Sequence, residues 1–174
     1  MNKVKVHYKD SLAYYELAFF LKQHLDKDSV IVCIGTDRCI GDCLGPMVGT
    51  LLQEKHFPLP VYGTISKPIH ALNLKKELSQ INHMHPKANL IGIDACLGDT
   101  DSIGEIQIRN YPIHPGKGVG KSLPLVGEIS IIGIVDTIEN NELFSNRSIR
   151  LDLIINISKV IVDALFYAVN MSSN

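Results

Sequence analysis

Continuous apolar runs rich in β-branched residues recur along the chain. The three strongest are Val30–Gly35, Asn89–Ile93 and Ile129–Val135, and none of them alternates with polar positions. Such runs are typical of central parallel strands that are covered on both faces. Val61–Ile65 predicts a further short strand. In Glu105–Arg109 the apolar residues alternate with polar ones, which predicts a less buried strand.

Helical spacing of apolar residues fills the segments between and after these strands. Four helices are expected: from a cap at Asp10 or Ser11 to about Leu25, from Gly45-Pro46 to about His56, from Ala71 to His83, and from about Arg150 to Val169. The alternation of strands and helices predicts a three-layer α/β fold, in which a mostly parallel central sheet carries helices on both faces. The length of 174 residues suits one domain, 1–174, and no repeat or linker is visible.

The segment Leu153–Val169 is apolar enough to be compared with a membrane span. It is interrupted by Asn156, Lys159 and Asp163, and the last two are spaced i,i+4 on one helix face. A buried C-terminal helix is therefore favoured over a membrane segment. The first nine residues are charged and do not resemble a signal peptide. We expect a cytoplasmic protein without a membrane partner.

Composition and charge limit the kinds of molecule that this protein is expected to bind. Hydrophobic residues make up 45% and charged residues 20%, and the formal net charge is −1. This is the balance of an ordinary globular protein. No long basic run is present, which argues against a nucleic acid as the main partner.

Two acidic residues follow buried strands at the ends where α/β proteins place their sites. Asp42 lies in Gly41-Asp42-Cys43-Leu44-Gly45-Pro46, where the flanking glycines permit a tight turn, and Asp94 follows the run that ends at Ile93. If the two strands are neighbours, the carboxylates share a proton and form a base and acid pair that activates water for amide hydrolysis. The alternative is that Asp42 caps a helix and Asp94 caps a turn.

His114 precedes a glycine-rich loop and is the main histidine candidate. With Asp42 and Asp94 it would complete a mixed oxygen and nitrogen metal site; the alternative is a loop histidine bonded to backbone. Gly116, Gly118 and Gly120 offer backbone N–H groups for an anion. Their spacing differs from that of a nucleotide-binding P-loop.

Three cysteines accompany the aspartates. Cys39 and Cys43 flank Asp42, Cys96 follows Asp94 by two positions, and Cys33 lies within a predicted strand. A Cys–His nucleophile is one interpretation, and small buried fillers are the other. We expect reduced thiols, and their spacing fits no structural zinc pattern.

At these same segments the sequence resembles the bacterial spore germination protease, and more closely the small YyaC-type sporulation proteins related to it. The matching segments are Asp42-Cys43-Leu44-Gly45-Pro46, Ile93-Asp94-Ala95, Ile113-His114-Pro115-Gly116-Lys117-Gly118-Val119-Gly120 and Val162-Asp163-Ala164. The resemblance implies the fold of the hydrogenase-maturation proteases. It also implies that Asp42 and Asp94 correspond to the catalytic aspartates of the germination protease, which degrades small acid-soluble spore proteins.

The leading hypothesis is therefore a sporulation- or germination-associated peptidase that uses Asp42 and Asp94 on a protein or peptide substrate, in the cytoplasm of the forespore or spore core. No cofactor is expected. One alternative is a metal-binding relative of the hydrogenase-maturation proteases, with a divalent metal at Asp42, Asp94 and His114. Another is a non-catalytic spore protein that retains the fold, because the chain lacks the propeptide and insertions of the germination protease. Homo-oligomer formation is left open.

Overall fold

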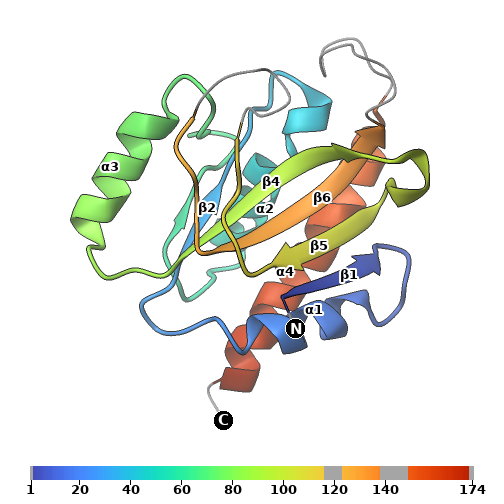
Figure 1. Cartoon of the computed structure of the whole chain (residues 1–174), viewed down its shortest axis with the longest axis horizontal. Coiled ribbons are helices and arrows are strands. Elements are labelled where there is room, and N and C mark those ends of the chain that lie inside the picture. Colours follow the sequence, from blue (N-terminus) through green and yellow to red (C-terminus); the bar gives the residue numbers. More distant parts are fainter. Residues whose placement is uncertain (1, 116–122, 138–148, 173–174) are drawn as a thin grey trace.

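The computed structural model describes residues 2–115, 123–137 and 149–172, and within them one six-stranded mixed sheet forms the centre of the fold (Figure 1). Its strands, in the spatial order β1-β5-β6-β4-β2-β3, are β1 (Lys3–His7), β5 (Glu105–Arg109), β6 (Ile129–Thr137), β4 (Leu90–Gly98), β2 (Val30–Cys33) and β3 (Val61–Tyr62). β3, β2, β4 and β6 are mutually parallel, and β5 runs antiparallel to β6 and to β1. The predicted α/β class is confirmed.

Helices cover the two faces of the sheet unequally. The helices are α1 (Ala13–Leu21), α2 (Leu44–Glu54), α3 (Leu74–Met84) and α4 (Leu151–Ser172). Residues of α1, α2 and α4 share one hydrophobic cluster with one face of the sheet, and α3 contributes to a second cluster on the opposite face. Figure 1 shows α3 standing apart from the other three helices. The apolar β-branched runs are therefore covered on both sides.

The main departures from the predicted elements have local physical causes. Lys3–His7 forms β1, which was not predicted, because only alternate residues of this edge strand face the core. β3 keeps only Val61 and Tyr62, which pair with Ile31 and Val32. β5 has the predicted bounds.

The C-terminal helix packs inside the protein fold as predicted. Ile154, Ile157, Ile161 and Leu165 are almost completely buried in the first cluster. In the part of the chain that the structure describes, no helix is long and apolar enough to cross a membrane.

Candidate functional site

Asp42 is held at the end of β2 by a close backbone approach. It ends the short 3-10 helix η1 (Ile40–Asp42), and its carbonyl oxygen accepts a hydrogen bond of 2.9 Å from the N–H of Thr36. Gly35 has φ +138°, and a Cβ there would lie 2.0 Å from the Asp42 carbonyl oxygen. Only glycine fits this position without a shift of the backbone. The positive φ thus belongs to Gly35, whereas the predicted tight-turn glycines Gly41 and Gly45 have none.

Asp94 lies where β4 loses one of its two neighbours. The last pair in the β2–β4 ladder is Cys33 with Ile93, and β4 then continues beside β6, where Asp94 pairs with Ile132. The predicted strand Asn89–Ile93 is therefore too short, because pairing with β6 extends β4 to Gly98 and places Asp94 within it. What ends at Ile93 is the contact with β2, and η1 occupies the adjoining space, in contact with β4.

The two carboxyl groups are electrostatically linked. Burial raises the pKa of Asp94 well above its usual range, and the negative charge of Asp42 raises it further. The N–H of Ala95 donates a hydrogen bond of 2.9 Å to Asp94 Oδ1, which opposes this rise. Burial also raises the pKa of Asp42 from 3.8 to about 6. Asp94, whose pKa is raised by both burial and the charge of Asp42, is therefore the member of the pair whose protonated form is favoured, and the two carboxyl groups titrate as a unit.

A simple capping role does not explain Asp42. α2 begins at Leu44 with Cys43 at its N-cap, and no side chain makes a capping hydrogen bond there. Asp94 bonds the N–H of Ala95, but it does so within a strand rather than in a turn. Among the described residues, both carboxyl groups are thus partly desolvated without strong partners that would lower their pKa, and this pattern is typical of functional sites.

The cysteines lie near the pair but remain thiols. All four are free. Burial, followed by the charges of Asp37, Asp42 and Cys39, raises the pKa of Cys43. Burial and Asp94 raise the pKa of Cys96. Because the thiolate is the nucleophilic form, these shifts argue against a Cys–His nucleophile. Cys33 is completely buried in the first cluster, which confirms its predicted core position.

His114 is exposed, although its neighbours Ile113 and Pro115 are buried. Within the described residues, no three His, Cys, Asp or Glu side chains are grouped to hold a metal ion. The structure therefore brings Asp42 and Asp94 together but does not group His114 with them. Gly116, Gly118 and Gly120 lie outside the described residues, so the anion-cradle prediction stays a prediction.

One charged residue near this edge was missed from the sequence. Arg109, on β5, lowers the pKa of Cys96 by its positive charge, in opposition to Asp94. Cys96 therefore lies within electrostatic reach of both Asp94 and Arg109. The available signal was the alternation of Glu105, Gln107 and Arg109, which places these side chains on one face of the strand.

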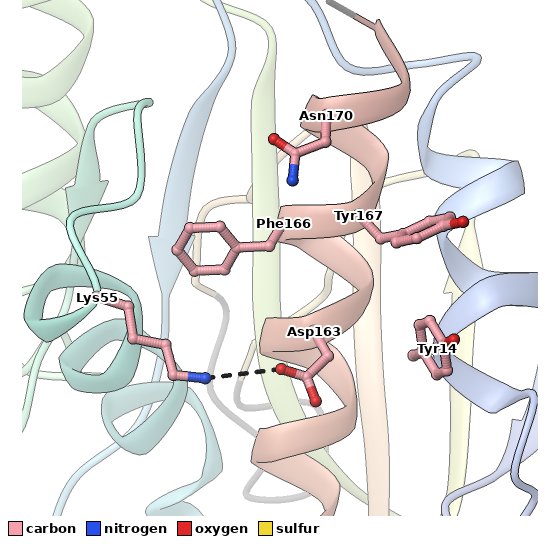
Figure 2. A pocket seen from close by; sticks show the side chains of 6 residues that line it. All are labelled: Tyr14, Lys55, Asp163, Phe166, Tyr167 and Asn170. Carbon is pink, nitrogen blue, oxygen red and sulfur yellow. Dashed lines mark ion pairs between the residues drawn. The ribbon is translucent and has the colours of Figure 1, made fainter.

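Two hollows on the protein surface lie away from the aspartate pair. One hollow of about 480 Å³ lies over α4 and is shown in Figure 2. It is lined by Tyr14, Lys55, Asp163, Phe166, Tyr167 and Asn170. Asp163 forms an ion pair of 3.6 Å with Lys55, which directly follows α2. The partner of Asp163 is therefore not Lys159, its i,i+4 neighbour on the same helix. A second hollow, of about 500 Å³, lies on α3. Neither includes an aspartate of the pair, whose assignment rests on burial and strand register.

Both aspartates lie in a region shared with known proteins. The family model described as "Protein of unknown function (DUF1256)" matches residues 5–164, a span that contains both aspartates. The chain belongs to this family. It is also 42% identical over 150 residues to the uncharacterized protein YyaC of Bacillus subtilis (strain 168), which covers 86% of this chain and 73% of the relative. The YyaC-type part of the resemblance is therefore confirmed.

Proposed function

We propose that this protein is a peptidase, associated with sporulation or germination, in which Asp42 and Asp94 hydrolyse a peptide bond. The observation that carries the proposal is the electrostatic linkage of two half-buried carboxyl groups whose pKa values are both raised. A relation to the germination protease and to the hydrogenase-maturation protease fold supports it through the matched segments around both residues. Small acid-soluble spore proteins are the substrates that this relation suggests.

The difference in burial between Asp42 and Asp94 indicates which carboxyl group is the base and which is the acid. Asp42, with a pKa of about 6, is the base and takes a proton from water as the water oxygen attacks the peptide carbonyl carbon. Asp94, whose pKa is raised by burial and by the charge of Asp42, is the acid and donates its proton to the carbonyl oxygen. When the tetrahedral intermediate collapses and the C–N bond breaks, Asp42 gives its proton to the leaving nitrogen. The hydroxyl proton returns to Asp94, so both groups recover their starting states.

The direct test replaces each carboxyl group by an amide of nearly equal size. Asp42→Asn and Asp94→Asn should each lower the rate of cleavage of a purified small acid-soluble spore protein by at least about 100-fold, because each removes one half of the acid–base pair. Cleavage is followed by gel electrophoresis and mass spectrometry, and folding by circular dichroism. Asp28→Asn is the matched control, since Asp28 is exposed and precedes β2 at the opposite end of that strand.

The same assay separates the alternatives. Full cleavage by both asparagine variants would refute the acid–base assignment. Activity lost on chelation and regained with nickel or zinc would favour the metal-dependent relative. A folded wild-type protein that cleaves no spore protein under any of these conditions would favour the non-catalytic binding protein.

A further inference from the structure

One face of β1 and β5 has no described helix packed against it. Alternate residues of these strands, including Val6, Ile106 and Ile108, belong to the first hydrophobic cluster. The intervening side chains point to the opposite face, and no residue of β1 or β5 belongs to the second cluster, to which α3 contributes. In Figure 1 both strands lie at the edge of the sheet that is farther from α3. The six side chains of this "β1–β5 face" are Lys3, Lys5, His7, Glu105, Gln107 and Arg109.

Strand register places this face in line with Asp94. One row of paired residues crosses four strands in the order Lys5, Gln107, Ile132 and Asp94. Asp94 shares its face of β4 with Leu90 and Cys96, which contact the second cluster. All four side chains of the row therefore point to the same face of the sheet. With neighbouring strands about 4.8 Å apart, Gln107 lies about 10 Å from Asp94 and Lys5 about 14 Å from it.

Hydrogen bonds orient Arg109 over this row. Its Nε and Nη2 atoms donate to Gln107 Oε1 at 3.2 and 2.6 Å, and Gln107 Nε2 donates to Glu105 Oε2 at 2.9 Å. Gln107, the middle residue of this hydrogen-bonded series, is only 5% exposed, so its side chain is held in place. Within the described residues, the remaining Nη1 makes no hydrogen bond. A guanidinium oriented in this way is suited to bind a carboxylate.

The charges on the β1–β5 face are mostly positive. Lys3 and Lys5 are exposed and Arg109 is half-buried, so three cations face a single carboxylate, Glu105. Lys5 lies 3.4 Å from that carboxylate. The face is thus positive on a chain whose formal net charge is −1. Local charge of one sign favours a ligand of the other.

We propose that the β1–β5 face binds acidic side chains of an extended peptide substrate whose scissile bond lies at Asp42 and Asp94. This inference rests on the proposed peptidase function and names its substrate class. Ile132, between Asp94 and Gln107, is only 4% exposed and belongs to the second cluster, so the peptide passes around it. An extended chain advances about 3.3 Å per residue, so the guanidinium over Gln107 receives a carboxylate at least about three residues from the bond that is cut. A peptide fits better than a nucleic acid, because the row ends at a carboxyl pair that would repel consecutive phosphates.

The test measures binding separately from cleavage. Its probe is a fluorescein-labelled peptide of alternating glutamate and serine, about ten residues long, which spans the roughly 14 Å between Asp94 and Lys5 in extended form. Fluorescence anisotropy compares it with the matching glutamine–serine peptide on the Asp42→Asn protein, which should not cut either. The glutamate peptide should bind more tightly, and added salt should weaken its binding.

Three variants on that background locate the binding. Arg109→Gln, and separately Lys3→Gln combined with Lys5→Gln, should each weaken binding of the glutamate peptide by about tenfold, since each removes attraction to carboxylates. Lys76→Gln removes one exposed charge from α3 and should change nothing. Because Lys3 and Lys5 are exposed, the double variant keeps the test valid even if Arg109→Gln fails to fold.

The contrary outcomes are distinct. Equal affinity for both peptides, or undiminished binding by the lysine double variant, would overturn the proposal. Tighter binding of a single-stranded RNA of equal length, with the same dependence on Lys3 and Lys5, would replace the peptide by a nucleic acid. If Asp42→Asn and Asp94→Asn both keep full activity while acidic peptide still binds at this face, the catalytic proposal fails and the binding surface stands.

Discussion

At the level of single residues, the raised pKa values of Asp42 and Asp94 lower the stability of the folded protein near neutral pH. A buried carboxyl group with a raised pKa binds a proton more tightly in the folded than in the unfolded chain. Near neutral pH the folded protein must therefore either desolvate a charge or keep a proton that the unfolded chain would release. Both choices lower the free energy of unfolding. Such a cost is commonly retained where the group has a chemical task.

The first prediction concerns pH and stability. The pKa of Asp42 rises from 3.8 to about 6 on folding, so the folded state binds more protons between these values and the free energy of unfolding falls as pH rises through them. The full stability is present below about pH 4, and the loss from Asp42 reaches about 3 kcal/mol near pH 7. Asp42→Asn should remove this loss and raise stability near pH 7 by up to that amount. Urea denaturation at about pH 3.5 and about pH 7 measures it.

Two results would oppose this reading of Asp42. If Asp42→Asn lowered stability equally at both pH values, the carboxylate would be a stabilising partner rather than a desolvated group. If Asp28→Asn produced the same gain near pH 7, the effect would come from overall charge. Asp94→Asn should act in the same direction as Asp42→Asn, because burial raises its pKa too.

At the scale of elements, the pair depends on how α2 meets β2. A Cβ at Gly45 would lie 2.1 Å from the carbonyl oxygen of Ile34 and 2.7 Å from its backbone nitrogen. The first turn of α2 therefore contacts the backbone just beyond β2 directly, and η1 immediately precedes this turn in the chain. This junction, rather than any side-chain contact, determines where Asp42 lies relative to β4.

The second prediction tests this junction. Gly45→Ala should lower the free energy of unfolding by about 1–3 kcal/mol, because backbone atoms must move to admit the methyl group. Helix propensity alone would raise stability by up to about 1 kcal/mol, so the sign separates the two effects. Ser79→Ala, at an exposed position of α3, is the matched control and should be neutral or slightly stabilising. Thermal and urea denaturation of both variants provide the measurement; a more stable Gly45→Ala protein would contradict the close approach.

At the scale of the whole molecule, the sheet couples two hydrophobic clusters. The first joins α1, α2 and α4 to one face, and the second joins α3 to the other. β2, β4 and β6 supply residues to both clusters in alternation, such as Ile131 to the first and Ile132 to the second. Neither layer can lose its packing without exposing the strands that support the other.

The third prediction is that both layers unfold together. Leu17→Ala in the first cluster and Ile81→Ala in the second should each lower the free energy of unfolding by about 2–5 kcal/mol, since both side chains are almost completely buried. Circular dichroism and tyrosine fluorescence should report one coincident transition in each variant. Leu72→Ala, at a residue 84% exposed, should change stability little. Separate transitions for the two probes would show that the layers are independent.

Hydrophobic periodicity records which faces are buried, so the α/β class and most element positions could be predicted from the amino-acid sequence. Glu105–Arg109 was predicted with its observed bounds, whereas Lys3–His7 was missed because half of that strand faces away from the core. The sequence also identified Asp42 and Asp94 as candidates, since residues at strand ends and the matched segments are local features.

The interaction between Asp42 and Asp94 could not be predicted from local sequence patterns. Desolvation and mutual charge depend on distances between β4 and η1, which no local pattern contains. The alignment of Lys5, Gln107 and Asp94 depends on strand order and register, because β1 and β4 are far apart in sequence but belong to the same sheet. The sequence could therefore nominate the aspartates, while pairing among four strands placed a positive face in line with Asp94.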